Sequence, residues 1–288
     1  LIPSKLLYKY YFMKKAIWSN ILQELDLNKK YFQSEGISLK DQISFNFLNQ
    51  EKIFSYPINW NDKNLPKLWR YNLHYFDWAK NWLKNYVSGN DLNNELDSVP
   101  FIIDDWIKNN PLGKGDGWHS YTISLRIRNW VWLFRFRPDF VNQERLNYLW
   151  IQLLWLDTHP EDFYGGNHWI ENICAKIVCS LNFESKYSKK ILNQSLNQLS
   201  FELKNQILED GGHEERSISY HILILDRLLE VGFLIEKINK SRPDWLVLNV
   251  EKMFNFIKKI RLENGNYPRF NDNGDNLSPT VDEVIFLS

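Results

Sequence analysis

The hydrophobic pattern of the chain is helical over most of its length. Apolar residues recur every three to four positions from Trp69 to about Leu262, which is the period of an amphipathic helix. Breaks rich in Asn, Asp, Gly and Pro separate these runs. The pattern predicts helices near residues 72–88, 96–109, 119–136, 142–157, 167–182, 188–208, 215–235 and 244–261. We therefore expect an all-α fold in this region.

The segment before Trp69 is less regular. Residues 4–25 and 28–34 have helical patterns, and the runs ISFNFL and KIFSYPINW within 37–60 predict a short β-hairpin. These patterns predict three parts in the chain. They are a helical and irregular extension over 1–68, a helical domain over 69–265, and the start of a linker over 266–288.

A weak internal repeat emerges when histidines are aligned with the loops before them. The spacings between the four histidines are 45, 49 and 45 residues, about the length of two helices with their connections. These histidines are His74, His119, His168 and His213. The period is that of an array of αα-hairpins, in which every second helix begins at the same rim. Helix N-termini carry unpaired N–H groups that suit a carboxylate or sulfate.

Composition excludes several kinds of partner. Thirty-five basic residues balance thirty-five acidic ones, so no overall field favours nucleic acid. No apolar stretch is long enough for a membrane span, and residues 1–18 lack the apolar core of a signal peptide. Cys174 and Cys179 point to different faces of a helix, which predicts free buried thiols. An aromatic content of 16% requires a large core or an aromatic-lined groove.

Three polar motifs stand out among the helices. In GDGWHSYTISLRIRNW, residues 115–130, His119 and Arg126 share one polar stripe with Thr122 and Asn129. Arg126 is expected either to form a salt bridge inside the bundle or to grip acidic groups of a substrate.

The second motif is DFYGGNHWIENICAK, residues 162–176. Asn167 and His168 follow a Gly-Gly loop at the start of a helix, with Glu171 and Asn172 one turn further on. Asn167 either caps this helix or belongs to a site. The third motif, LEDGGHEERSISYHILILDRLLE, residues 208–230, places Tyr220 near a polar helix start.

Together the motifs GWHSYTISLRIRNW, GGNHWIEN and DGGHEERSISYH, with YPRFNDNGDN after them, resemble the heparinase II/III family of polysaccharide lyases. The resemblance covers about residues 70–276 and implies an all-α domain, an incomplete (α/α) toroid of αα-hairpins. It also implies a β-sandwich domain after the toroid, before which this chain is expected to end. That domain usually carries a second catalytic histidine and a structural metal. No histidine follows His221 here, and no cofactor is expected in this chain.

The resemblance also implies a reaction. Lyases of this family act on acidic, uronate-containing polysaccharides by β-elimination, which removes a proton from C5 and breaks the C4–O bond. The carboxylate must first be neutralised, a task that the resemblance gives to Asn167 and His168, with Tyr220 as acid or base. A phenolate would need cationic neighbours, for which His221, His168, Arg216 and Arg126 are candidates. Further substrate-binding residues are expected to be Trp118, His119, Arg126, Glu171, Asn172, His213, Glu214, Arg216 and His221.

The sequence is also compatible with two other functions. An inverting glycoside hydrolase on a similar toroid would need a carboxylate pair, for which Glu214, Glu215, Glu171 and Asp116 are available. A helical repeat that binds glycan without turnover, in surface-polysaccharide metabolism, would also fit the aromatic content. The family resemblance predicts a periplasmic or extracellular location.

Overall fold

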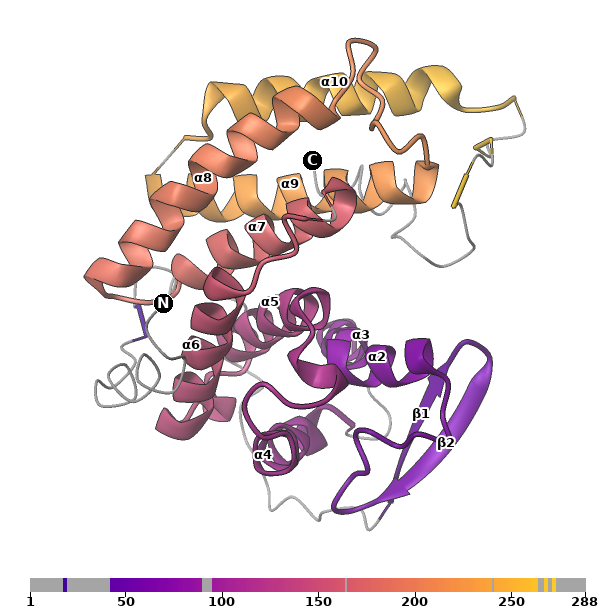
Figure 1. The fold of residues 1–288 in the computed structure, drawn as a ribbon, viewed down its shortest axis with the longest axis vertical. Helices are drawn as coiled ribbons and strands as arrows, with labels where there is room; N and C mark the ends of the chain where they lie inside the picture. Colours follow the sequence, from indigo (N-terminus) through magenta and orange to yellow (C-terminus); the bar gives the residue numbers. More distant parts are fainter. Residues whose placement is uncertain are drawn as a thin grey trace. The chain divides into compact units, whose positions relative to one another are not determined.

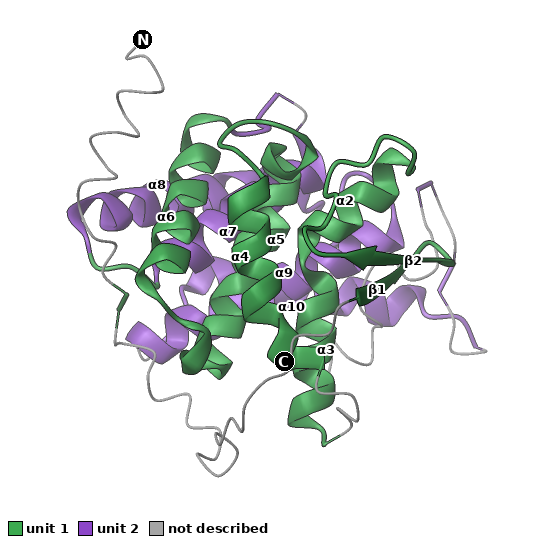
Figure 2. Cartoon of the chain, turned by 90° about the horizontal axis from the view of Figure 1, so that it is seen from below, with its two compact units in different colours: residues 1–159, 182–184 green, residues 160–181, 185–288 purple. Residues whose placement is uncertain are grey.

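The computed structural model describes residues 18–19, 42–89, 95–163, 165–239, 241–263, 267–268 and 271–272. The chain divides into two compact units (Figure 2). Unit 1 comprises residues 1–159 and 182–184, and unit 2 comprises 160–181 and 185–288. Helices dominate the described part of both units, which confirms the all-α prediction. The domain boundary predicted at residue 68 falls inside unit 1.

Unit 1 begins with the hairpin predicted from the sequence. Strands β1 (Gln42–Phe47) and β2 (Gln50–Ser55) pair in antiparallel register, with Phe47 opposite Gln50. The two residues of the turn, Leu48 and Asn49, both have positive φ, as a tight hairpin turn of the mirror-image kind requires. Unit 1 continues through α2 (Lys67–Tyr75), α3 (Asp77–Val87), α4 (Val99–Asn109), α5 (Ser120–Phe136) and α6 (Gln143–Thr158), with short 3-10 helices at Glu95–Ser98, Asp116–Trp118 and Pro138–Phe140 (Figure 1).

The helix predicted over 72–88 is interrupted in the structure. Phe76 adopts a left-handed conformation with φ of 64°, which ends α2 and starts α3. Its ring is fully buried and packs against Trp60, Trp78 and Trp130. Burial of the ring offsets the backbone strain, since an aromatic side chain contributes a large apolar area.

Aromatic side chains fill the core of unit 1 around α5, which packs against α2, α3 and α6. Trp69, Trp106 and Trp130 are fully buried, and none of the tryptophans in the described residues is fully exposed. The high aromatic content therefore serves mainly the core. Trp18 lies in an isolated β-bridge to Phe183, so the helix predicted over 4–25 is wrong at this point. The remainder of that segment, and the helix predicted over 28–34, lie outside the described residues.

Unit 2 consists of two αα-hairpins in the part that the structure describes. Helices α7 (Gly166–Ser180) and α8 (Lys186–Gln206) form the first, and α9 (Ile218–Asn239) and α10 (Asp244–Ile260) form the second (Figure 1). Helix α7 packs against both α8 and α9, and α10 packs against α9. Cys174 and Cys179 are buried free thiols in α7, as predicted. No helix in the described ranges is long and apolar enough to cross a bilayer.

Candidate active site

Unit 2 brings Asn167 and Glu215 into direct contact, although 48 positions separate them in the chain. The backbone N–H of Asn167 donates to Glu215 Oε1 at 2.6 Å, and Asn167 Nδ2 donates to Glu215 Oε2 at 3.3 Å. Asn167 lies in the first turn of α7, where backbone N–H groups have no partner within the helix. Glu215 therefore places a carboxylate at the positive end of α7.

The start of α7 differs from the simplest prediction. The N-cap position belongs to Gly165, not to Asn167, and no side chain of the cap residue bonds to the helix. Gly166 has a φ of 54°, and a Cβ atom at this position would lie 2.5 Å from Glu215 Oε1. A glycine is thus required both by the backbone conformation and by the close approach of Glu215.

Tyr220 lies in the first turn of α9 and is half-buried. Its backbone N–H donates to Ser217 Oγ at 3.3 Å, as in a helix cap, and Ser217 Oγ donates to the Asp272 carbonyl at 3.2 Å. Because Glu215 contacts Asn167 and precedes α9 by three residues, the starts of α7 and α9 lie together. That part of the predicted arrangement of helix starts is confirmed.

The electrostatic environment of Tyr220 is the opposite of the one suggested by the sequence. Burial raises the pKa of the phenol, and the negative charges of Asp272 and Glu215 raise it further. The predicted cationic neighbour His221 is uncharged at neutral pH, since burial lowers its pKa to about 4. Tyr220 is therefore a neutral phenol at neutral pH, suited to donate a proton.

His168 follows Asn167 and keeps 45% of its side chain exposed. Its Nδ1 lies 3.7 Å from Oε2 of the buried Glu161. Glu161 is fixed in turn by Asn172, whose Oδ1 accepts from the Glu161 backbone at 2.9 Å and whose Nδ2 donates to the carboxylate at 3.3 Å. Asn172 is fully buried, so it supports Glu161 and His168 from within.

Glu171 is also internal. It is buried and accepts from Arg227 Nε at 2.6 Å, while Arg227 Nη1 donates to Asp226. The predicted substrate-binding role of Glu171 and its use in a hydrolase pair both require an accessible carboxylate. This burial argues against both roles.

Both histidines of the third motif are buried. His213 lies in an isolated β-bridge with Ile207, five residues before α9, and its Nε2 contacts Gln206 Oε1 at 3.0 Å. Burial and the neighbouring His221 lower its pKa to about 4. His221 contacts the Met253 carbonyl through Nε2 at 3.1 Å. Glu214 and Arg216 are exposed, and Arg216 has a φ of 53° in the turn before α9.

The histidine repeat is irregular in the structure. His119 occupies the N-cap position of α5, and His168 lies in the first turn of α7. His74, however, lies in the last turn of α2, and His213 lies in a loop. The prediction that all four mark helix starts is therefore wrong.

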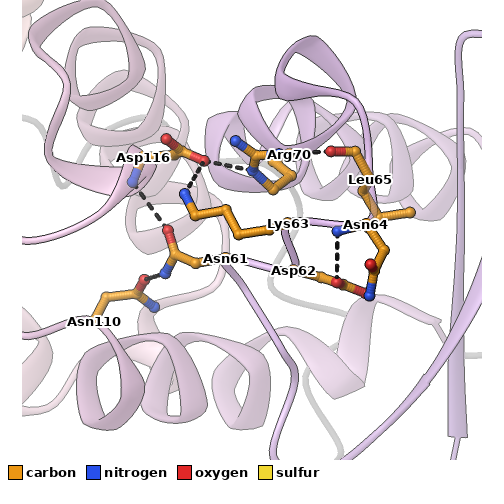
Figure 3. Close-up of polar contacts among 8 residues, drawn as sticks. All are labelled: Asn61, Asp62, Lys63, Asn64, Leu65, Arg70, Asn110 and Asp116. Atoms are coloured by element: carbon orange, nitrogen blue, oxygen red, sulfur yellow. Dashed lines mark hydrogen bonds and ion pairs between the residues drawn. The ribbon is translucent and has the colours of Figure 1, made fainter.

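In unit 1, the loop before His119 is held by polar contacts (Figure 3). Asp116 accepts from Arg70 Nε at 2.5 Å, and its backbone N–H donates to Asn61 Oδ1 at 2.9 Å. Lys63 Nζ lies 4.0 Å from the same carboxylate. Asp116 is thus engaged by cations, which disfavours its use as a hydrolase acid. Trp118 is buried and donates from Nε1 to the Asn110 carbonyl at 3.2 Å.

Arg126 is fully buried in unit 1. Its guanidinium donates to Gln152 Oε1 at 2.6 Å and to the carbonyls of His74 and Gly117 at 3.2 and 2.6 Å, and it lies 4.0 Å from the Trp106 ring. The salt bridge suggested for Arg126 is wrong, because its partners are neutral oxygens. Complete burial also argues against direct contact with a substrate. His119 is half-buried, with its ring 5.4 Å from that of Tyr71.

Three residues at the starts of α7 and α9 are not among the site residues that the sequence predicts: Glu215, Ser217 and Asp272. The sequence indicates Glu215 only as a hydrolase carboxylate, and its contact with Asn167 has no local sequence signal. Asn271 donates from Nδ2 to the Glu215 carbonyl at 2.8 Å, so Asn271 also lies beside Glu215. Among the described residues, no group of three or more His, Cys, Asp or Glu is arranged to hold a metal ion.

The helical fold of this chain is that of the helical domain of a polysaccharide-lyase family. Residues 4–283 match the family described as Heparinase II/III N-terminus, and the chain belongs to that family. It is 27% identical over 218 residues to the heparin-sulfate lyase of Pedobacter heparinus, covering 70% of this chain and 32% of that protein. It is 30% identical over 193 residues to the heparin-sulfate lyase of Bacteroides thetaiotaomicron. This alignment covers 62% of this chain and 27% of that protein.

Solved structures support the fold. The crystal structure of heparinase III aligns with a TM-score of 0.62 and 24% identity over 93% of this chain and 46% of that one. The crystal structure of the heparan sulfate lyase of P. heparinus aligns with a TM-score of 0.62. This alignment covers 93% of this chain and 45% of that one. This likeness confirms the predicted fold class. The aligned region is about a third or less of the length of the two curated relatives.

Proposed function

We propose that the protein cleaves an acidic, uronate-containing polysaccharide by β-elimination, with heparan sulfate as the first substrate to test. The chain belongs to a family whose relatives are heparin-sulfate lyases, which supports this class of substrate. The observation that carries the proposal is the polar cluster of unit 2. In it Asn167, Tyr220 and Glu215 gather where α7 and α9 begin.

Asn167 and His168 are proposed to neutralise the substrate carboxylate. An amide N–H and an imidazole N–H donate hydrogen bonds to a carboxylate, and they stabilise the negative charge that grows on it as the C5 proton leaves. The exposed part of His168 is accessible to such a ligand, and its Nδ1 lies 3.7 Å from the buried Glu161, which Asn172 fixes in turn.

Tyr220 is proposed to protonate the leaving oxygen. In the elimination, the C5–H electron pair forms the C4–C5 double bond, the C4–O bond breaks, and the oxygen gains a proton. The raised pKa of Tyr220 keeps the phenol protonated, which suits a donor. We assign removal of the C5 proton to a group outside the described residues, such as the histidine that the family resemblance implies for a following β-rich domain.

The test is the ultraviolet absorbance of the unsaturated uronate product. The full-length gene product is incubated with heparan sulfate, chondroitin, hyaluronan, alginate and bacterial exopolysaccharides, as wild type and as Tyr220→Phe. We expect absorbance to rise on at least one polymer and the rise to be lost in the variant. Cleavage to saturated products would indicate a hydrolase, and binding without cleavage would indicate a glycan-binding module; either result would overturn the proposal.

A further inference from the structure

We propose that Glu215 is a positioning residue that holds the Asn167 carboxamide ready for the substrate carboxylate; this inference rests on the function proposed above. Glu215 receives two hydrogen bonds from one residue, at 2.6 Å from the backbone and 3.3 Å from Nδ2 of Asn167. Two bonds to one carboxylate fix both the backbone and the side chain of Asn167. A single contact would leave the side chain free to rotate.

The contact also decides which way the amide faces. A carboxylate oxygen accepts hydrogen bonds, so the amide nitrogen of Asn167, and not its oxygen, faces Glu215. That nitrogen carries two hydrogens. With one engaged by Glu215, the second is held in a defined direction, and Asn167, unlike the fully buried Arg126, keeps 6% of its surface exposed.

The backbone of Glu215 is itself held in place by two neighbours. Asn271 Nδ2 donates to its carbonyl at 2.8 Å, and its backbone N–H donates to His213 Nδ1 at 3.3 Å. The missing side chain of Gly166 leaves room for its carboxylate. The backbone of Glu215 thus has a fixed position, which a group that orients another residue requires.

A fixed amide matters for the proposed reaction because the carboxylate must be bound before the C5 proton can leave. Misplacement of such a donor lowers the rate of the chemical step more than it lowers substrate affinity. The inference therefore predicts a loss in kcat with KM little changed.

A double-mutant cycle tests the inference. Asn167→Ala, Glu215→Ala and the double variant are assayed on the polymer that the wild type cleaves, at a temperature where each is folded by circular dichroism. We expect Glu215→Ala to lower kcat by on the order of 10- to 100-fold, as loss of a residue that supports a catalytic group does. In the Asn167→Ala background the same substitution should have little further effect, because the carboxamide that it orients is gone.

Glu215→Gln keeps the shape of the side chain and should recover part of the loss, because its amide oxygen can still accept one bond from Asn167. Glu209→Gln is the matched control, since it removes a carboxylate from an exposed position of the same loop; it should retain wild-type kcat.

Three results would overturn the inference. Independent, multiplying losses in the double variant would show that Glu215 acts apart from Asn167. A fall in thermal stability with unchanged kcat would show a purely structural role. Tighter substrate binding in Glu215→Ala would show that its carboxylate occupies the place of the substrate. If Asn167→Ala itself retains full activity, the proposed function fails first, and the two failures are thereby distinguished.

Discussion

Arg227 donates from Nε to Glu171 Oε2 at 2.6 Å, and both side chains are buried in unit 2. Although burial alone would lower the pKa of Arg227, the negative charges of Glu171 and Asp226 raise it. Removal of one member of a buried pair costs about 3–5 kcal/mol when the other charge is left without a partner. Because Asp226 remains paired with Arg227, we expect Glu171→Ala to lower the free energy of unfolding by less than this amount but by more than about 1 kcal/mol, as measured by urea denaturation.

The exposed pair of Glu236 and Arg242, at 2.8 Å, provides the control. Surface pairs contribute less than about 1 kcal/mol, so Glu236→Ala should change stability little. Similar losses in the two variants would contradict the structural role assigned to Glu171.

Acid should destabilise the protein through His213 and His221. The pKa of each is lowered to about 4 in the folded state, against an ordinary value of 6.5. As pH falls, the unfolded state therefore binds protons first. The stability that the two neutral histidines provide is complete above pH 6.5 and is lost between pH 6.5 and 4. The loss between pH 7 and pH 5 is about 2 kcal/mol for each histidine.

Urea unfolding of wild type and His221→Phe at pH 7 and pH 5 measures this loss. The variant lacks one of the two groups, so its stability should depend less steeply on pH. Equal pH dependence in the two proteins would mean that His221 does not keep a lowered pKa in the folded state.

The helices could be predicted from the sequence because their apolar period and their Gly, Asn and Pro breaks are local signals. The predicted helix over 142–157, for example, corresponds to α6 at Gln143–Thr158. Phe76 was missed because an aromatic residue gives no local sign of a left-handed backbone. Its conformation depends on tertiary contacts with Trp60 and Trp130.

The same distinction applies to the candidate site. Asn167 and Tyr220 lie in motifs that sequence alone can pick out. Glu215 meets Asn167 only because α7 and α9 pack together, and no spacing along the chain encodes that contact. The burial of Arg126 could not be predicted either, because a polar stripe on a helix usually faces solvent, whereas here it faces the interior of unit 1.

Asp272 should control the ionisation of Tyr220. Burial is the main reason that the pKa of Tyr220 is raised, and the charge of Asp272 is the next. Replacing Asp272 with Asn removes a negative charge that disfavours the phenolate, so the pKa of Tyr220 should fall. A titration of ¹³C-labelled tyrosine by NMR measures this shift, with the Tyr220 signal identified by its absence in Tyr220→Phe. An unchanged or higher pKa in Asp272→Asn would contradict the assigned electrostatics.

Gly165 and Gly166 form a matched pair that tests how close Glu215 approaches α7. Both glycines have positive φ, at 62° and 54°, so alanine at either position costs about 1–2 kcal/mol of backbone strain. A Cβ at Gly165 meets open space, whereas a Cβ at Gly166 would lie 2.5 Å from Glu215 Oε1. Both variants should therefore lose this stability in urea unfolding, and Gly166→Ala should lose more, because the displaced carboxylate also loses its hydrogen bonds with Asn167. Only Gly166→Ala should also displace the Glu215 carboxylate and lower kcat in the product-absorbance assay, by about tenfold or more. Equal kcat in the two variants would show that the position of Glu215 does not affect the reaction.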